Sequence, residues 1–202
     1  MTTKRKPIIL FDMDCSLFDY QHAMIADLNK MAENESELIT VEENLWHLDN
    51  NPVMNARQEE IKARKNWWRD LPPIALGFDI YNHCKNLGYK IEILTKGPRK
   101  FPNAWAEKLE CCQIHFGSKV NVNVVTHKQY FFGDILYDDF PSYQSAWLKQ
   151  HANGLGIMPA YPSNYNYFNS RLIRLDDSNV EEVKERLTKL IKNDIHPTTS
   201  IQ

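Results

Sequence analysis

The sequence lacks any apolar run close to the roughly 20 residues that a helix needs to cross a bilayer. Its basic first residues, 1–7, are not followed by the long apolar segment of a secretory signal. The cysteines, at positions 15, 84, 111 and 112, do not have metal-site spacing, and adjacent cysteines seldom bridge each other. We therefore expect a soluble, cytoplasmic protein with free thiols and no membrane partner.

The chain also lacks an excess of charge of either sign. Its 24 Lys and Arg residues face 26 Asp and Glu residues, which gives a formal net charge of −2. Proteins that bind duplex nucleic acid normally carry a clustered basic surface, so we expect no stable nucleic-acid complex. With 202 residues, the chain is long enough for one domain with a modest insertion. These properties do not decide the oligomeric state and leave a homodimer open.

The most informative segment is residues 8–17, where a short apolar run leads into Asp12 and Asp14. A run this short, preceded by Pro7, predicts a buried parallel strand with both acids at its carboxyl end. Open α/β sheets bind ligands at that end, and alternation along the strand directs both acids to one side. Two close carboxylates repel each other, and a divalent cation relieves the repulsion. From this motif alone, a strand that ends in a solvated acidic turn is an equally good interpretation.

Helix and strand patterns alternate through the second half of the sequence. The patterns predict helices over residues 74–87, 103–116 and 142–151 and a last helix that follows residues 176–178. They predict strands over residues 90–95, 121–126, 134–138 and 155–158, with an edge strand over 171–175. The predicted fold class is therefore α/β, a Rossmann-like parallel sheet with helices on both faces.

Only helical patterns occur between the first two predicted strands. They predict helices over residues 19–34 and 53–68 and a short helix after Thr40. A block of roughly 60 residues is too long for a plain crossover connection. We therefore predict a core formed by residues 1–16 and 73–202, with a small helical cap, residues 17–72, inserted after the first strand.

Further polar groups stand at the ends of later strands: Thr95, Lys128 and the pair Asp138–Asp139. Together with the Asp-x-Asp segment they give the order Asp-x-Asp, Thr, Lys, acidic pair. This order, in this strand context, resembles the four motifs of the haloacid dehalogenase superfamily of phosphotransferases. The resemblance implies a phosphohydrolase with the α/β fold described above.

The resemblance narrows to the 5′(3′)-deoxyribonucleotidases, and to their bacterial and phage members. It covers residues 7–165 and rests on an aromatic residue six positions after Asp14, an aromatic pair before Leu-Pro-Pro at 71–73, and the segments 94–98, 105–108, 133–141 and 156–164. Two positions depart from the family pattern. Cys15 stands where the family has glycine, and Lys96 stands where mammalian members have serine, which bears on phosphate-site geometry and 5′ versus 3′ preference.

The resemblance implies a role for each motif residue, and the residue types suit the chemistry. Asp12 is the expected nucleophile, which forms an aspartyl-phosphate, and Asp14 is the expected general acid and base. Thr95, Lys96 and Lys128 are expected to bind the phosphate, because phosphoryl transfer needs hydrogen-bond donors and positive charge around the phosphoryl oxygens.

The same resemblance implies a magnesium ion. The expected ligands are a carboxylate oxygen of Asp12, the backbone carbonyl of Asp14, and Asp138, together with water and the phosphate. Asp139 is the alternative to Asp138, and we favour Asp138 as the direct ligand.

The predicted cap is rich in aromatic residues, and aromatic side chains stack on nucleobases. Tyr20, Trp67 and Trp68 are the expected base-binding residues, although each of them also suits a small hydrophobic core. The predicted substrate is a (deoxy)ribonucleoside monophosphate. Alternatives are another small phosphate ester, a nucleic-acid phosphate end, or a phospho-binding module without catalysis. Retention of Asp14 favours turnover, because binding alone does not need that acid.

Overall fold

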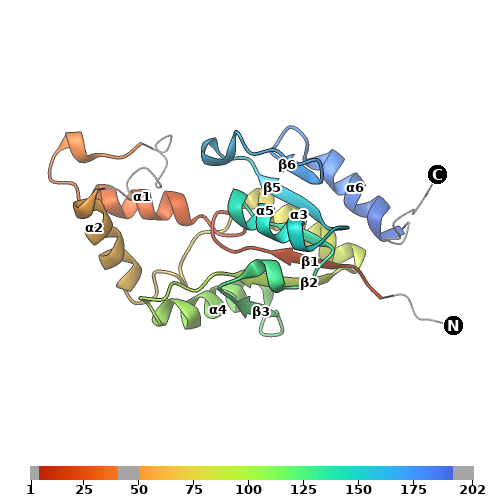
Figure 1. The fold of residues 1–202 in the computed structure, drawn as a ribbon. Coiled ribbons are helices and arrows are strands. Elements are labelled where there is room, and N and C mark those ends of the chain that lie inside the picture. The colour runs from red at the N-terminus through yellow and green to blue at the C-terminus, as the bar shows by residue number, and fades with distance from the viewer. Residues whose placement is uncertain (1–4, 41–50, 193–202) are drawn as a thin grey trace.

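The computed structural model describes residues 5–40 and 51–192. Its centre is a six-stranded parallel sheet with the order β3-β2-β1-β4-β5-β6 (Figure 1). The strands are β1 Ile8–Phe11, β2 Lys90–Thr95, β3 Val122–Val124, β4 Ile135–Tyr137, β5 Leu155–Pro159 and β6 Leu172–Leu175. This architecture confirms the predicted α/β fold class.

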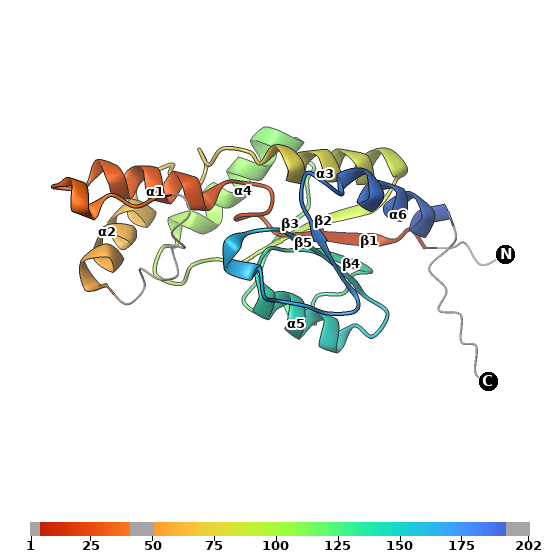
Figure 2. The ribbon, with the colours of Figure 1, turned by 90° about the horizontal axis from the view of Figure 1, so that it is seen from above.

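Four helices cover the two faces of the sheet, as Figure 2 shows. Three of them, α3 (Ala75–Leu87), α4 (Asn103–Phe116) and α6 (Val180–Lys192), lie on one face, and α5 (Pro141–Gln150) lies on the other. β1 is buried on both sides, which explains its continuous apolar run. None of the helices in the described ranges has the length and apolar character of a membrane span.

The strand order reverses beside β1, and this reversal places the acidic motifs side by side. The chain runs outward from β1 through β2 to β3, and then returns to add β4 on the opposite side of β1. The carboxyl ends of β1 and β4 therefore flank the point where the connections diverge. Doubly wound sheets bind their ligands at this point.

A helical insertion, residues 19–71, lies beyond the carboxyl ends of the strands, at the left of Figure 1. It contains α1 (Tyr20–Lys30), a short 3-10 turn (Glu35–Glu37) and α2 (Pro52–Ala63). The insertion has its own small hydrophobic cluster between α1 and α2, formed by Met24, Ile25, Leu28, Ile39, Met54 and Ile61. The short helix predicted after Thr40 falls outside the described residues.

The predicted end of the second insertion helix, at residue 68, is wrong. α2 ends at Ala63, and residues 65–70 form turns, with Asn66 in the left-handed region at φ 68°. The carboxylate of Glu107, on α4, accepts the backbone N–H groups of Asn66 and Trp68. This tertiary contact replaces the hydrogen bonds that another helical turn would make. The apolar periodicity of residues 53–68 does not reveal such a contact.

The loop after β1 packs tightly on the first turn of α3. Cys15 adopts a φ of 55°, in the left-handed region where glycine is favoured. Gly77 lies so close to this loop that a Cβ atom added to it would stand 2.1 Å from the carbonyl oxygen of Ser16. Glycine at position 77 therefore sets how closely α3 approaches the residues that follow Asp14.

We expect Gly77→Ala to destabilise the protein by about 3 kcal/mol, because two backbone segments must separate to accept the methyl group. In a protein of this size that corresponds to a fall in Tm of roughly 6–12 °C, measured by thermal denaturation. Gly117→Ala is the matched control, since nothing lies within 4 Å of its added Cβ and only its positive φ opposes alanine. Equal melting of the two variants would contradict a rigid contact at Gly77.

Candidate active site

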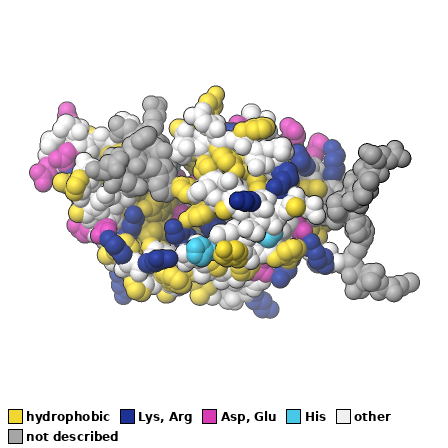
Figure 3. Space-filling model, viewed as in Figure 1, with side chains coloured by type: hydrophobic (Ala, Val, Ile, Leu, Met, Phe, Trp, Pro, Cys, Tyr) yellow, Lys and Arg dark blue, Asp and Glu magenta, His cyan; other side chains and the backbone are white. Residues whose placement is uncertain are grey.

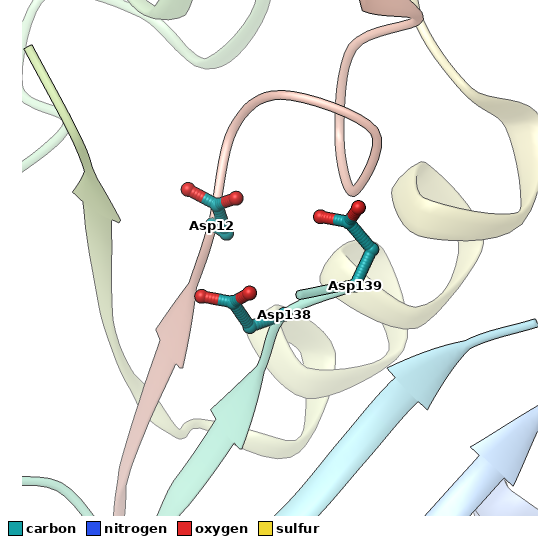
Figure 4. Close-up of side chains that lie close together, drawn as sticks. All are labelled: Asp12, Asp138 and Asp139. Carbon is teal, nitrogen blue, oxygen red and sulfur yellow. The ribbon is translucent and has the colours of Figure 1, made fainter. Parts of the chain in front are cut away.

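Three carboxylates converge where β1 and β4 end (Figure 4). Asp12 follows β1 directly, and Asp138 and Asp139 follow β4. Their oxygen atoms lie within 4.8 Å of one another, and Asp12 and Asp138 are buried. The backbone N–H of Asp12 donates to the carbonyl of Tyr137 at 2.8 Å, which continues the pairing of the two strands and fixes Asp12 beside the acidic pair.

Lys128 is buried between two of these acids. Its Nζ lies 2.6 Å from Oδ1 of Asp12 and 2.7 Å from Oδ2 of Asp138. Burial alone would lower the pKa of Lys128, but the charges of Asp12 and Asp138 outweigh burial and raise this pKa, so the side chain stays cationic. The structure thus brings together Asp12 and Lys128, which the sequence places more than a hundred residues apart.

Asp138 and Asp139 differ in the hydrogen bonds that they accept from the rest of the protein. Asp138 accepts Lys128 on one oxygen and the backbone N–H of Phe140, at 2.9 Å, on the other. Asp139 accepts only a long contact of 3.4 Å from the Ser16 hydroxyl among the side-chain bonds of the described residues. Burial raises the pKa of Asp138 to about 7 despite Lys128, and burial together with the charge of Asp138 raises the pKa of Asp139 well above its ordinary value.

Asp14 pairs with a different lysine from the one that contacts Asp12. Lys108, on α4 and fully buried, forms an ion pair with Oδ2 of Asp14. The same Nζ donates to the Thr95 hydroxyl at 3.0 Å and to the carbonyl of Lys96 at 3.1 Å. The second oxygen of Asp14 is buried and has no hydrogen-bond partner among the residues that the structure describes. Burial raises the pKa of Asp14 above its ordinary value, and the charge of Lys108 opposes this rise.

Sequence reasoning gave Lys108 no role, although its position carries a signal. Ala104, Cys111 and Cys112 recur at helical spacing and are all fully buried against the sheet. Lys108 lies on this same stripe, and lysine is almost never fully buried unless it is paired. A lysine on the buried face of a helix that follows the Thr95 strand is therefore a sign of a charged partner.

Thr95 and Lys96, the other two residues predicted to bind the phosphate, lie at the end of β2 and directly after it. Thr95 is fully buried at the end of β2, with its hydroxyl beside Lys108. Lys96 is exposed, and its Nζ lies 5.8 Å from the ring centre of Tyr143, whose other cationic contact is Lys128. Figure 3 shows further Lys and Arg side chains on this face near the junction of the insertion with the sheet, which suits an anionic ligand.

The Cys15 thiol lies near the acidic residues of this site. Its thiol is buried, and burial together with the charges of Asp139 and Asp14 raises the thiol pKa well above its ordinary value. The thiolate is the nucleophilic form of cysteine, so this thiol is unreactive.

Tyr20, Trp67 and Trp68, the three predicted base-binding residues, form one aromatic cluster. Trp68 stacks on Tyr20 with ring centres 5.5 Å apart, and the Nζ of Lys108 lies 4.8 Å from the Trp68 ring. Trp67 is half-buried and packs edge-on against both Tyr20 and Trp68, while its Nε1 donates to Asp27 at 2.9 Å. Trp68 is only 3 % exposed, so Tyr20 and Trp67 offer more ring surface than Trp68 does.

The sequence that builds this site also matches a known family. Residues 6–187 match the family model "5' nucleotidase, deoxy (Pyrimidine), cytosolic type C protein". The chain belongs to this family. It is thus an enzyme of the 5′-nucleotidase class, and the sequence resemblance is confirmed. No curated protein matches the chain.

Solved structures agree with the fold. A haloacid dehalogenase-like hydrolase from Burkholderia xenovorans has 14 % identity and a TM-score of 0.52, with 88 % of this chain and 97 % of that chain covered. A haloacid dehalogenase family hydrolase from Deinococcus radiodurans, solved with bound phosphate and sodium, has 9 % identity and a TM-score of 0.55, with 91 % and 96 % covered. At these identities the likeness shows the fold alone.

Proposed function

We propose that this protein hydrolyses (deoxy)ribonucleoside monophosphates with the aid of magnesium and through an aspartyl-phosphate on Asp12. The observation that carries the proposal is that Asp12 lies beside the acidic pair and contacts Lys128, while Asp14, two residues later, pairs with Lys108. The same end of the sheet would thus supply a nucleophile, a proton carrier and two cations.

The first step transfers the phosphoryl group to the protein. A carboxylate oxygen of Asp12 forms a bond to phosphorus, the ester P–O bond breaks, and the leaving oxygen of the nucleoside takes a proton from Asp14. Asp14 suits this role because burial raises its pKa and favours the protonated acid. Thr95, beside Asp14, and Lys128, beside Asp12, can bind the phosphoryl oxygens.

The second step returns the protein to its starting state. Asp14, now deprotonated, takes a proton from water, the water oxygen bonds to phosphorus, and the bond between phosphorus and Asp12 breaks. Lys108 stabilises the deprotonated Asp14, which this step requires. One carboxyl group thus serves as acid and then as base, and the overall reaction consumes one water molecule and releases phosphate.

Magnesium fits the acids that the structure collects. Asp12, Asp14, Asp138 and Asp139 carry four negative charges when ionised, against the two positive charges of Lys108 and Lys128. The raised pKa values of Asp138 and Asp139 reflect burial of charge that these lysines do not fully offset. Carboxylate and carbonyl oxygens are the ligands that magnesium prefers, and the ion would supply positive charge beside the transferred phosphoryl group.

The contacts favour Asp139 over Asp138 as the direct ligand, in contrast to the preference stated from the sequence. Both oxygens of Asp138 are already engaged, by Lys128 and by the Phe140 N–H. We propose that Asp12, the carbonyl of Asp14 and Asp139 hold the metal, and that Asp138 positions Lys128.

Asp139→Asn should therefore raise the magnesium concentration for half-maximal activity by about 10-fold or more, since carboxylate ligands dominate magnesium affinity. Asp138→Asn should change this concentration less and should lower turnover at saturating magnesium, because Lys128 loses a charged partner. Magnesium titrations of the two variants against the wild type measure both effects. The reverse order would restore Asp138 as the ligand.

The proposed function is tested by measuring phosphate release from a panel of phosphate esters, in the presence and in the absence of magnesium. The panel contains 5′ and 3′ (deoxy)ribonucleoside monophosphates, a sugar phosphate, a 3′-phosphorylated oligonucleotide and p-nitrophenyl phosphate. We expect magnesium-dependent hydrolysis with the highest kcat/KM for nucleoside monophosphates. Preference for the sugar phosphate or the oligonucleotide would overturn the substrate assignment, and no turnover at all would leave the phospho-binding alternative.

A further inference from the structure

Glu107 is a buried carboxylate that joins α4 of the core to the helical insertion. Its side chain is 7 % exposed. One oxygen accepts the backbone N–H of Asn66 at 2.9 Å, and the other accepts the backbone N–H of Trp68 at 3.2 Å. The amide of Asn103 adds a contact of 3.3 Å from the same helix. The residues that Glu107 holds belong to the segment that returns from the insertion to α3.

The two backbone bonds lie on either side of Trp67. They fix the chain before and after this residue, in a segment where Asn66 has a left-handed φ of 68° and no regular helix is present. The Trp67 ring centre lies 5.5 Å from Tyr20 and 4.9 Å from Trp68. Glu107 thus holds the backbone from which the Trp67 and Trp68 rings extend, while their indole N–H groups donate to Asp27 and to the Lys62 carbonyl.

Glu107 also stands next to the phosphate site in sequence and in space. The following residue, Lys108, reaches Asp14 and Thr95, and the Trp68 ring covers its Nζ at 4.8 Å. Consecutive buried residues of α4 thus contact the insertion through a negative charge and the reacting centre through a positive one. Within the described ranges no Lys or Arg forms a salt bridge with Glu107, so its charge is met by N–H donors.

We propose that Glu107 is a positioning residue that sets the Trp67–Trp68 segment above the phosphate site and so determines selectivity for nucleotides over small phosphate esters. This rests on the proposed function, in which the aromatic cluster contacts the base. A carboxylate suits the role because both of its oxygens accept, whereas an amide has one accepting oxygen and turns its NH₂ group toward an N–H donor. Glu107→Gln keeps the shape and removes one of the two bonds.

The first measurement is hydrogen exchange of the Asn66 and Trp68 amides in the full-length protein. Glu107→Gln should speed exchange at one or both amides by about 10-fold or more, because a buried bond to a charged acceptor is lost. The control is Glu110→Gln, the same change on an exposed residue one turn further along α4, which should leave both amides unchanged. Unchanged exchange in Glu107→Gln would overturn the proposal.

The second measurement separates positioning from a general loss of structure. Glu107→Gln should raise KM for the best nucleotide by about 10-fold to 30-fold and change kcat/KM for p-nitrophenyl phosphate by less than about 3-fold. Glu107→Asp, which keeps both acceptors on a shorter side chain, should show a smaller loss of the same kind and serves if the glutamine variant does not fold. Equal losses on both substrates would overturn the selectivity role.

Failure of the proposed function gives a different experimental result from failure of the proposal for Glu107. If the wild-type protein itself shows no preference for nucleotides over p-nitrophenyl phosphate, the substrate assignment fails, and the selectivity role of Glu107 fails with it. If the wild type prefers nucleotides and Glu107→Gln retains that preference, the substrate assignment stands and only the proposal for Glu107 is overturned.

Discussion

Asp12→Asn should reduce turnover to less than about 1 % of the wild-type value on nucleotides and on p-nitrophenyl phosphate alike. Asparagine has nearly the same shape as aspartate, but its amide is a poor nucleophile. Asp12 stands at the end of β1, and one of its side-chain oxygens lies 2.6 Å from the Nζ of Lys128. The pairing of β1 with β4 uses backbone groups, so the substitution leaves the strand and its pairing intact. Initial-rate assays at saturating magnesium measure the effect.

The fold should survive this change. The substitution removes one charge from a crowded group of acids, and Lys128 keeps Asp138 as a partner at 2.7 Å. We expect Tm to stay within a few degrees of the wild type, with the exposed Asp177→Asn as the matched control. Rapid quenching should find protein-bound phosphate in the wild type and none in Asp12→Asn. Activity above about 1 % with bound phosphate retained would assign the nucleophile to another residue.

Much of the fold could be predicted from the sequence because local patterns determine it. β1 and β4 are short apolar runs, and each is followed by acids that mark the carboxyl end of a strand. Parallel strands bring these ends to a single edge, so Asp12, Lys128 and Asp138 could be expected to meet. The structure places them together at the edge that the strand ends predict.

The errors and omissions all involve contacts between elements that are distant in sequence. α2 ends at Ala63 because Glu107 accepts amides that a longer helix would have used, and no pattern within residues 53–68 reports this. Lys108 was likewise left without a role, although it lies on a buried helical stripe. The preference for Asp138 as metal ligand stays a prediction, and the sequence does not reveal that Lys128 and the Phe140 N–H contact both of its oxygens in the folded chain.

Lys108→Met should lower kcat/KM by about 100-fold, the range expected when a residue that supports general acid–base catalysis is removed. Methionine fills a similar volume without charge. Asp14 then loses its cation while one of its oxygens already lacks a partner, and the Thr95 hydroxyl loses its donor. The loss should be similar for nucleotides and p-nitrophenyl phosphate, because Asp14 and Thr95 act at the phosphate, which both substrates carry, whereas Glu107→Gln should affect nucleotides selectively.

The pH dependence of kcat shows which of the two steps of the reaction Lys108→Met slows. Burial raises the pKa of Asp14 and Lys108 opposes this rise, so Lys108→Met should leave Asp14 protonated to a higher pH. The protonated form still serves as the acid of the first step, but the base needed to activate water becomes scarce. Phosphoenzyme should accumulate near neutral pH, and the acidic limb of the kcat profile should move to higher pH. Lys149→Met, at an exposed position on α5, is the control and should behave like the wild type. An unshifted limb without phosphoenzyme would show that Lys108 does not tune the pKa of Asp14.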